Sequence, residues 1–376
     1  MSKNESDLLA EVDRIAREVV APHALRVDAD AAFPRAAVDA LAKAGVLGLL
    51  SAPAVGGRGL GHRQAAQVIE RLARECGSTA MVVTMHYAAV LVLEKHASEA
   101  VRRDAATGKQ LATLAFSEAG SRSHFWAPLG TAGRVDGGVR LDAHKSWVTS
   151  ASHADLYVWS SRPLSAEGAS TIWLVPRTAK GLSIAGPFEG LGLRGNDSSP
   201  VKADAVVVPD SARLGADGGG FAVMMEIVLP IFQVLAAACS IGLMEGALER
   251  TAAHASGTRF DHLASALREL PTVRAYLARM RIQTDSARGL LLDTLDAMEK
   301  ARPDAMLRVL EVKAGAGEAS TVVTDLAMRV AGGAAFRREG GVERYFRDAR
   351  AATVMAPTTD VLYDFIGKAV CGMDLF

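Results

Sequence analysis

Residues able to do chemistry are thinly spread along this chain, and few of them stand at the spacing of a catalytic motif. The most suggestive run is the glycine-rich segment 56–61, because glycine-rich turns cradle phosphate groups in nucleotide-binding proteins. That segment follows a predicted helix instead of a strand, and it lacks the GxGxxG spacing of a dinucleotide site. A Walker A lysine, an HExxH pair and a GxSxG serine are all absent from the sequence. These patterns argue against a Rossmann-type nucleotide site, a zinc protease and an α/β-hydrolase.

The cysteines offer no metal or disulfide chemistry. Cys76, Cys239 and Cys371 are widely spaced, odd in number and form no CxxC pair. We therefore expect each to be a small buried hydrophobic side chain in a reducing compartment, and we predict no metal site. The first residues, from Met1 to Asp7, are polar and mostly acidic, unlike a signal peptide. We expect a cytoplasmic protein.

Composition excludes further classes of function. Lys and Arg total 42 and Asp and Glu also total 42, so the chain lacks the basic surplus typical of nucleic-acid binding. Hydrophobic residues make up 49% of the 376 residues, which is enough for a large core and argues against disorder. Every long apolar run is interrupted by a charge or a turn-forming residue, so we expect no membrane span.

The elements that must position any site fall into three zones. Apolar residues at helical spacing predict helices up to about residue 108, including 63–76 and 79–95. Short β-branched runs predict strands at 111–116, 139–147, 156–160, 171–175 and 205–208, with a hairpin at Asp136-Gly137. Helical periodicity returns at 221–254, 262–299, 304–330 and 359–370. We predict an α+β multidomain fold with an N-terminal helical domain (1–110), a middle β-sheet or barrel domain (111–215) and a C-terminal four-helix bundle (216–376).

Five segments in order make the chain resemble the acyl-CoA dehydrogenase family. They are 53–59 (PAVGGRG), 116–123 (FSEAGSRS), 145–150 (KSWVTS), 191–196 (LGLRGN) and 342–350 (VERYFRDAR), and Gly332-Gly333 precedes the last. The second and third resemble the family's TEPxxGS and KxWITN segments. The resemblance runs nearly end to end. It implies an FAD flavoprotein, with FAD expected rather than FMN, that acts on the CH–CH bond of an acyl-CoA or acyl-carrier-protein substrate. It also implies a homo-oligomer, which we expect to be a tetramer.

The resemblance also implies which residues contact the cofactor. Trp147 would cover one face of the flavin, and hydroxyl groups at strand ends would bond its heteroatoms. The family's usual Arg and Gln slots for the pyrophosphate hold Gly257 and Arg329, so Arg259 or Arg329 is expected to bind it across a subunit boundary. The full set of expected cofactor-binding residues is Phe116, Ser117, Ser123, Trp147, Thr149, Arg259, Arg329, Gly332, Gly333, Thr358 and Asp360.

The family's usual proton-abstracting base is missing. Relatives carry it as the Glu of an EGT triplet, where this chain has Ala356, Pro357 and Thr358. A second family position for the base falls at Phe232, beside Gln233, and neither side chain is a base. His86 is the first candidate for a relocated base, because its helix lines the acyl cavity in relatives, and Glu226 and His124 follow.

Three functions are therefore open. The first is α,β-dehydrogenation of an acyl thioester with a non-standard base, which retention of Ser117-Glu118 and of the Arg-Asp-Ala signature favours. The second is a flavin monooxygenase or N-oxygenase on the same fold, which needs no α-proton base. The third is a non-catalytic subunit of a hetero-oligomeric dehydrogenase. The changes at Ala356-Pro357, Phe232 and Gln233 favour the second and third.

Overall fold

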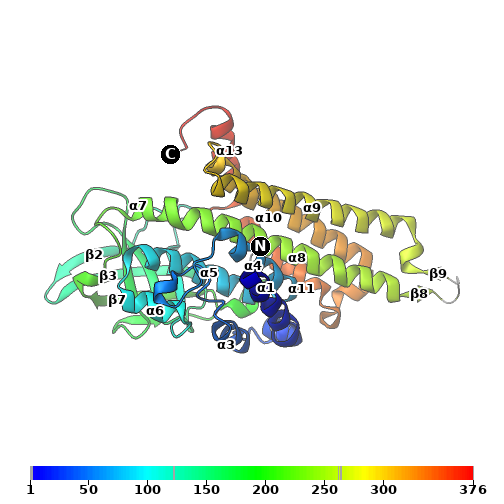
Figure 1. Ribbon diagram of the computed structural model, residues 1–376, viewed down its shortest axis with the longest axis horizontal. Helices are drawn as coiled ribbons and strands as arrows, with labels where there is room; N and C mark the ends of the chain where they lie inside the picture. The colour runs from blue at the N-terminus through cyan, green and yellow to red at the C-terminus, as the bar shows by residue number, and fades with distance from the viewer. Residues whose placement is uncertain (1–2, 122, 261, 263–264, 376) are drawn as a thin grey trace.

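The computed structural model describes residues 3–121, 123–260, 262 and 265–375. Helices come first in the chain, two small sheets follow, and long antiparallel helices end it (Figure 1). The predicted fold class is confirmed, and its middle part consists of two sheets instead of a barrel.

The described part of the N-terminal region contains six α-helices, and the fifth of these is almost completely buried. They are α1 (Lys3–Ile15), α2 (Ala24–Ala29), α3 (Arg35–Lys43), α4 (His62–Glu75), α5 (Gly77–His96) and α6 (Glu99–Ala106). A π-helical turn, Ala16–Val20, follows α1. α5 is buried on nearly every face, as its unbroken apolar sequence predicts. The predicted helices at 63–76 and 79–95 match α4 and α5 within two residues, whereas α6 was not predicted.

The middle region forms two sheets that enclose their own core. One sheet has the order β1 (Ala112–Ala115), β4 (Leu156–Ser161), β5 (Thr171–Pro176), and the other has β2 (Thr131–Val135), β3 (Gly138–Val148), β7 (Ser199–Val208), β6 (Leu182–Ile184). Leu141, Trp159 and Trp173 are fully buried in this core. The hairpin at Asp136-Gly137 is confirmed, because Val135 pairs with Gly138. β2 and β6 were not predicted.

The C-terminal region is a bundle of long helices. Its elements are α7 (Gly220–Ala222), the π-helical turn Val223–Val228, α8 (Leu229–Gly257), β8 (Arg259–Phe260), β9 (Ser265–Ala266), α9 (Pro271–Glu299), α10 (Ala305–Ala331), α11 (Val342–Ala349), α12 (Ala351–Val354) and α13 (Thr359–Val370). α8, α9 and α10 lie side by side along the long axis (Figure 1).

One helix boundary predicted from the sequence is wrong. The helix predicted from His262 begins only at Pro271, because the chain first forms the β8–β9 hairpin, in which Arg259 pairs with Ala266. Proline is well suited to the first turn of a helix, where its missing N–H costs nothing. Residues 263 and 264 of the predicted helix, and residue 261 just before it, lie outside the described residues.

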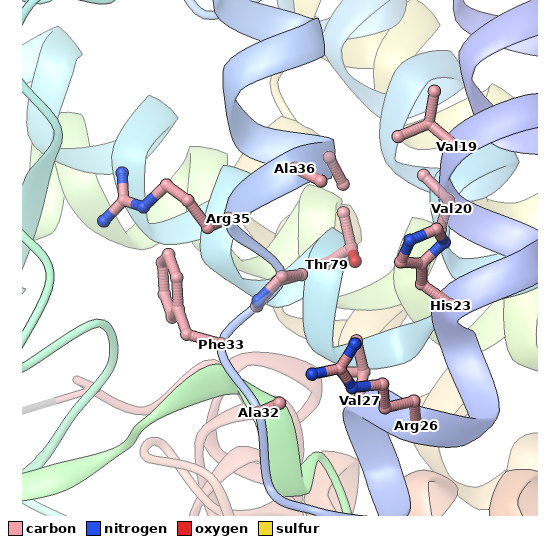
Figure 2. A pocket seen from close by; sticks show the side chains of 12 residues that line it. Val19, Val20, His23, Arg26, Val27, Ala32, Phe33, Arg35, Ala36 and Thr79 are labelled. Carbon is pink, nitrogen blue, oxygen red and sulfur yellow. The ribbon is translucent and has the colours of Figure 1, made fainter.

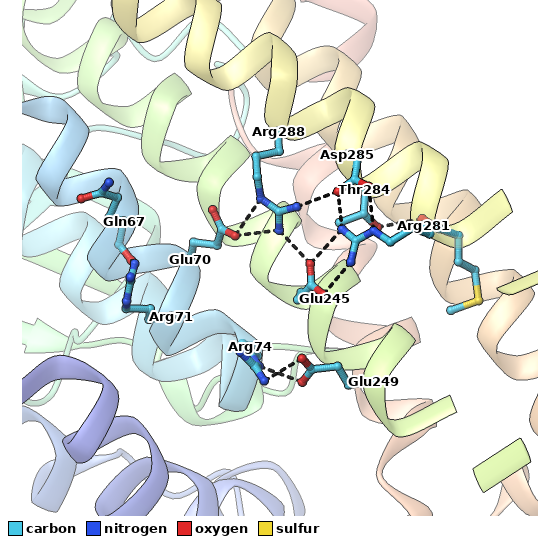
Figure 3. A network of polar contacts seen from close by, with 11 residues as sticks. Gln67, Glu70, Arg71, Arg74, Glu245, Glu249, Arg281, Thr284, Asp285 and Arg288 are labelled. Atoms are coloured by element: carbon cyan, nitrogen blue, oxygen red, sulfur yellow. Dashed lines mark hydrogen bonds and ion pairs between the residues drawn. The ribbon is translucent and has the colours of Figure 1, made fainter. Parts of the chain in front are cut away.

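A network of ion pairs ties the N-terminal helices to the bundle (Figure 3). Arg288 on α9 donates to Glu70 on α4 at 2.8 Å and to Glu245 on α8 at 2.7 Å. Arg281 donates to the same Glu245 at 2.8 Å. These side chains are partly exposed, so the network orients the helices more than it stabilises them.

Two helical segments are long and apolar enough to span a membrane by length and composition alone. They are Gly77–His96 and Gly220–Gly257, and 83% of the most apolar stretch of each is buried inside the structure. Both are core helices, since their apolar faces are already covered by the rest of the chain.

Candidate active site

A buried ion pair fixes the ends of β1 and β3, where the predicted cofactor residues begin. Lys145 Nζ donates to Glu118 Oε1 at 2.5 Å and to the carbonyl of Ser160 at 2.7 Å. Glu118 Oε2 accepts the N–H groups of Leu129 and Gly130 at 2.7 and 2.9 Å. Burial lowers the pKa of Lys145, and the adjoining carboxylate opposes that shift. The pair holds Ser117 and Trp147, which are sequence neighbours of its two members, at one edge of the middle region.

The side chain of Trp147 is positioned so that its ring can lie against a planar ligand. The side chain is 69% exposed, although Trp147 lies near the end of β3 between half-buried Ser146 and buried Val148, and its φ is +57°. The indole forms an edge-to-face contact with Phe188, with the ring centres 6.3 Å apart. A large aromatic held open in this way fits the predicted role of lying against a planar ring, and it does not fit a core role.

The hydroxyls near Trp147 are held in place by other polar groups. Thr149 is buried, and its Oγ1 lies 3.0 Å from the hydroxyl of Ser198. The carbonyl of Thr149 accepts a hydrogen bond from Thr113 at 2.7 Å. Ser117 is half-buried, and Phe116 is buried at the end of β1. The structure therefore brings Phe116, Ser117, Trp147 and Thr149 to neighbouring strand ends, as predicted.

A second group of predicted cofactor residues reaches this edge from the end of the chain. The N–H of Thr358 donates to Ser123 Oγ at 2.7 Å, across 235 positions of sequence. Thr358 caps α13, and Asp360 is exposed in the first turn of that helix. This contact sets the turn at 355–358 against the loop that follows β1.

The predicted pyrophosphate residues lie elsewhere. β8, which carries the exposed Arg259, is at the opposite end of the molecule from β3 (Figure 1). Arg329 donates to the hydroxyl of Tyr276 at 2.7 Å and stacks over its ring. Gly332 and Gly333 are exposed just beyond α10. Within one chain, the predicted pyrophosphate residues therefore lie away from Trp147. This is the arrangement expected if they act across a subunit boundary.

The proposed substitute bases are not placed alike. His86 is fully buried, its Nδ1 accepts the N–H of Ala112 at 3.1 Å, and burial lowers its pKa to about 4. This arrangement favours a structural, neutral role for His86. Glu226 is exposed on the π-helical turn before α8, and His124 is exposed beside Trp126. Within the described residues, no hydrogen bond or ion pair joins these three side chains to the turn at 355–358.

Lys313 is the site residue that sequence reasoning missed. Its side chain is 1% exposed, and its Nζ donates to the carbonyls of Met355 and Pro357 at 2.7 and 2.6 Å. Burial lowers its pKa to about 7. Helical spacing could have revealed that Lys313 is buried, since it follows Val309 by four residues on the buried face of α10.

A small cavity adjoins the turn at 355–358. It lies between α5, α8 and α12, and its lining includes Met81, Ser240, Leu243, Asp348, Ala352 and Met355. Burial raises the pKa of Asp348 to about 6, while the N–H of Leu193 holds its Oδ1 at 2.6 Å. Gln233 lies on the same face of α8 as Ser240 and is fully buried, and its amide makes no hydrogen bond to any described residue.

A larger cavity of about 270 Å³ lies among the N-terminal helices (Figure 2). Val19, Val27 and Phe33 give it an apolar wall, and His23 and Arg26 stand at its side. None of its lining residues belongs to the predicted site, so it is separate from the strand ends described above.

Three family models that match this chain describe the three domains of one family. The acyl-CoA dehydrogenase N-terminal, middle and C-terminal domain models match residues 2–108, 113–206 and 218–371. A cyclohex-1-ene-1-carbonyl-CoA dehydrogenase of Geobacter metallireducens is 28% identical over 95% of each chain. Butyryl-CoA dehydrogenase from Megasphaera elsdenii superposes with a TM-score of 0.91 at 20% identity over 99% of each chain. An FAD complex of PigA superposes with a TM-score of 0.90 at 20% identity, covering 99% of this chain and 98% of that one.

The open face of Trp147, the hydroxyls beside it and the family match agree on the cofactor, which is FAD. The chain belongs to the acyl-CoA dehydrogenase family and is an FAD-dependent oxidoreductase that acts on CH–CH donors.

Proposed function

We propose that this protein introduces a double bond between the α and β carbons of an acyl thioester, carried by CoA or by an acyl carrier protein, without a carboxylate at position 356. The observation that carries the proposal is the contact between Thr358 and Ser123, which sets the turn at 355–358 against the flavin-side strand ends. FAD, when bound, supplies the acceptor for the β hydrogen. The names of the relatives, which act on acyl-CoA substrates, support this class of substrate.

The turn retains one group that the reaction needs. Removal of an α proton leaves negative charge on the thioester oxygen, and an oriented backbone N–H stabilises that charge. The N–H of Ala356 makes no hydrogen bond within the described chain, and Ala356 is half-buried beside Thr358. It is therefore available to a thioester oxygen.

The reaction also needs a group that accepts the α proton. His86 is unsuitable, because it is enclosed in the core and already accepts a backbone hydrogen bond. Glu226 remains the carboxylate to test, since it is exposed on the π-helical turn before α8.

A monooxygenase or N-oxygenase is the second candidate. It is favoured by the loss of two side chains that are usually charged in the family, since positions 356 and 233 hold Ala356 and Gln233 and this chemistry needs no α-proton base. The two candidates differ in product. We expect mass spectrometry of the acyl product to show the loss of two hydrogen atoms, whereas the gain of one oxygen atom would establish the second candidate.

We further propose a cytoplasmic homotetramer. Large apolar side chains are exposed on the bundle, including Phe336 at 89%, Val370 at 72% and Val354 at 70%. A single chain rarely leaves such groups uncovered together, and burial between subunits would also bring a neighbour's Arg259 and Arg329 toward the cofactor. Light scattering at micromolar protein should give about four times the chain mass.

A further inference from the structure

A buried lysine lies directly behind the turn that carries position 356. Lys313 reaches from α10 and donates to two carbonyls, those of Met355 and Pro357, which flank Ala356 on either side. Burying a lysine amino group away from water is unfavourable unless hydrogen bonds compensate for the lost hydration. An apolar side chain of the same length would fill this space without that cost. The two hydrogen bonds are therefore what a lysine adds at this position.

These two hydrogen bonds fix the directions in which the neighbouring backbone N–H groups point. The carbonyl and the N–H of a trans peptide point to opposite sides of the chain. The carbonyl of Met355 points at Lys313, so the N–H of Ala356, in the same peptide unit, points away from Lys313. The carbonyl of Pro357 points at Lys313 as well, so the N–H of Thr358 also points away.

Thr358 shows what lies on that far side. Its N–H donates to Ser123 in the loop after β1, which is the edge that carries the predicted flavin residues. Of the two N–H groups that Lys313 directs to this side, one is taken by Ser123. The other, on Ala356, makes no hydrogen bond within the described chain.

We propose that Lys313 is a positioning residue, which aims the N–H of Ala356 at the carbonyl oxygen of a bound acyl thioester; this inference rests on the proposed function. Lys313 does not touch the substrate. It fixes the donor before the substrate arrives, which is what makes a hydrogen bond effective toward charge that develops during the reaction. Its N–H donors also polarise the 355–356 peptide unit, because hydrogen bonds in series strengthen one another.

The test uses FAD-loaded protein and three variants. Lys313→Met removes both donors at similar length, Lys313→Arg keeps a charged donor, and Lys313→Gln provides a second neutral variant in case Lys313→Met does not fold. Lys300→Met is the matched control, since Lys300 is exposed and, among the described residues, its amino group pairs with Asp296 one turn earlier. Thermal unfolding confirms that each variant is folded.

The first readout needs no substrate. Hydrogen–deuterium exchange is followed at the amides of residues 355–360. We expect Lys313→Met and Lys313→Gln to exchange at Thr358 about tenfold faster than wild type, Lys313→Arg to fall between them, and Lys300→Met to match wild type. Unchanged exchange in folded Lys313→Met would overturn the proposal.

The second readout reports the thioester itself. Cinnamoyl-CoA absorbs at longer wavelength when its carbonyl oxygen accepts a strong hydrogen bond. We expect wild type to shift this band, Lys313→Met to lose at least half of the shift, and Lys313→Arg to recover part of it. A full shift in Lys313→Met would overturn the proposal. If wild type binds cinnamoyl-CoA, as ultrafiltration shows, without any shift while amide exchange still depends on Lys313, then the proposed thioester function fails and the positioning of the turn stands.

Discussion

The backbone N–H of Thr358 lies 2.7 Å from the hydroxyl oxygen of Ser123, and this hydrogen bond joins the last turn before α13 to the loop after β1. Through it, the C-terminal bundle and the middle sheets meet at one edge. Lys313 holds the same turn from behind, through the carbonyls of Met355 and Pro357. The turn is thus fixed from both sides, although it lacks the carboxylate that the family usually places there.

Trp147→Ala should weaken FAD binding without destabilising the protein that lacks FAD. The indole is 69% exposed, so its removal leaves no cavity and should change the free energy of unfolding by less than about 0.5 kcal/mol. FAD affinity should fall by about tenfold or more, because one ring face loses its aromatic cover. Equilibrium dialysis and thermal unfolding measure the two effects. A large loss of stability with unchanged FAD affinity would show that Trp147 is an ordinary structural residue.

Restoring the family carboxylate should need a backbone change as well. Ala356→Glu alone should leave acyl-CoA oxidation weak, since Pro357 restricts the turn and removes one N–H. Adding Pro357→Gly should raise the rate, because a base displaced by ~1 Å loses roughly a hundredfold. The comparison is the anaerobic flavin-reduction rate of wild type, single and double variants with one saturating acyl-CoA. Equal rates in the single and double variants would refute this role of Pro357.

His86→Ala should affect stability and spare the chemistry. The change leaves the N–H of Ala112 without its acceptor and opens a cavity, which together should cost about 3 kcal/mol of unfolding free energy. His124→Ala, at an exposed position, is the control and should cost less than about 0.5 kcal/mol. If folded His86→Ala binds FAD yet loses all flavin reduction by substrate, His86 is the base after all.

The outline of the fold was readable from the sequence, because helical and strand periodicities in this chain agree with burial. The apolar faces of α5 and α8 and the Asp136-Gly137 hairpin are local patterns of this kind. The predicted helix start at His262 failed because a hairpin that pairs Arg259 with Ala266 depends on contacts beyond the local pattern.

The site was predictable only in part. Sequence similarity located Trp147 and Thr358 but gave no sign that the indole is exposed or that Ser123 accepts the N–H of Thr358. Lys313 was missed because a lone lysine in a helix usually reaches solvent, and only the folded chain shows that it ends on two carbonyls. Nor could the sequence show that His86 is fully buried and that its ring accepts the N–H of Ala112 at the start of β1.

Stability should rise with pH in a way that depends on Lys313. Burial lowers the pKa of Lys313 from 10.5 to about 7, so between these values the unfolded chain holds a proton that the folded chain has lost. The stability of the folded state therefore increases with pH across this window, by up to about 1.4 kcal/mol per pH unit from this group. This gain in the free energy of unfolding is complete above pH 10.5, and it is lost as the pH falls to 7.

The difference between wild type and Lys313→Met isolates that contribution from other titrating groups. Urea unfolding of both proteins from pH 7 to pH 10 should show wild type gaining stability relative to the variant. A difference that stays constant over this range would mean that the pKa of Lys313 is not lowered by folding.

The most direct measurement of the central claim is anaerobic mixing of the FAD-loaded protein with a panel of acyl-CoA thioesters. The account predicts that at least one thioester bleaches the flavin absorbance without oxygen, and that the thioester recovered carries a new α,β double bond. Absence of bleaching with every thioester, followed by substrate-dependent oxygen uptake once the flavin has been reduced chemically, would contradict dehydrogenation and establish the monooxygenase instead.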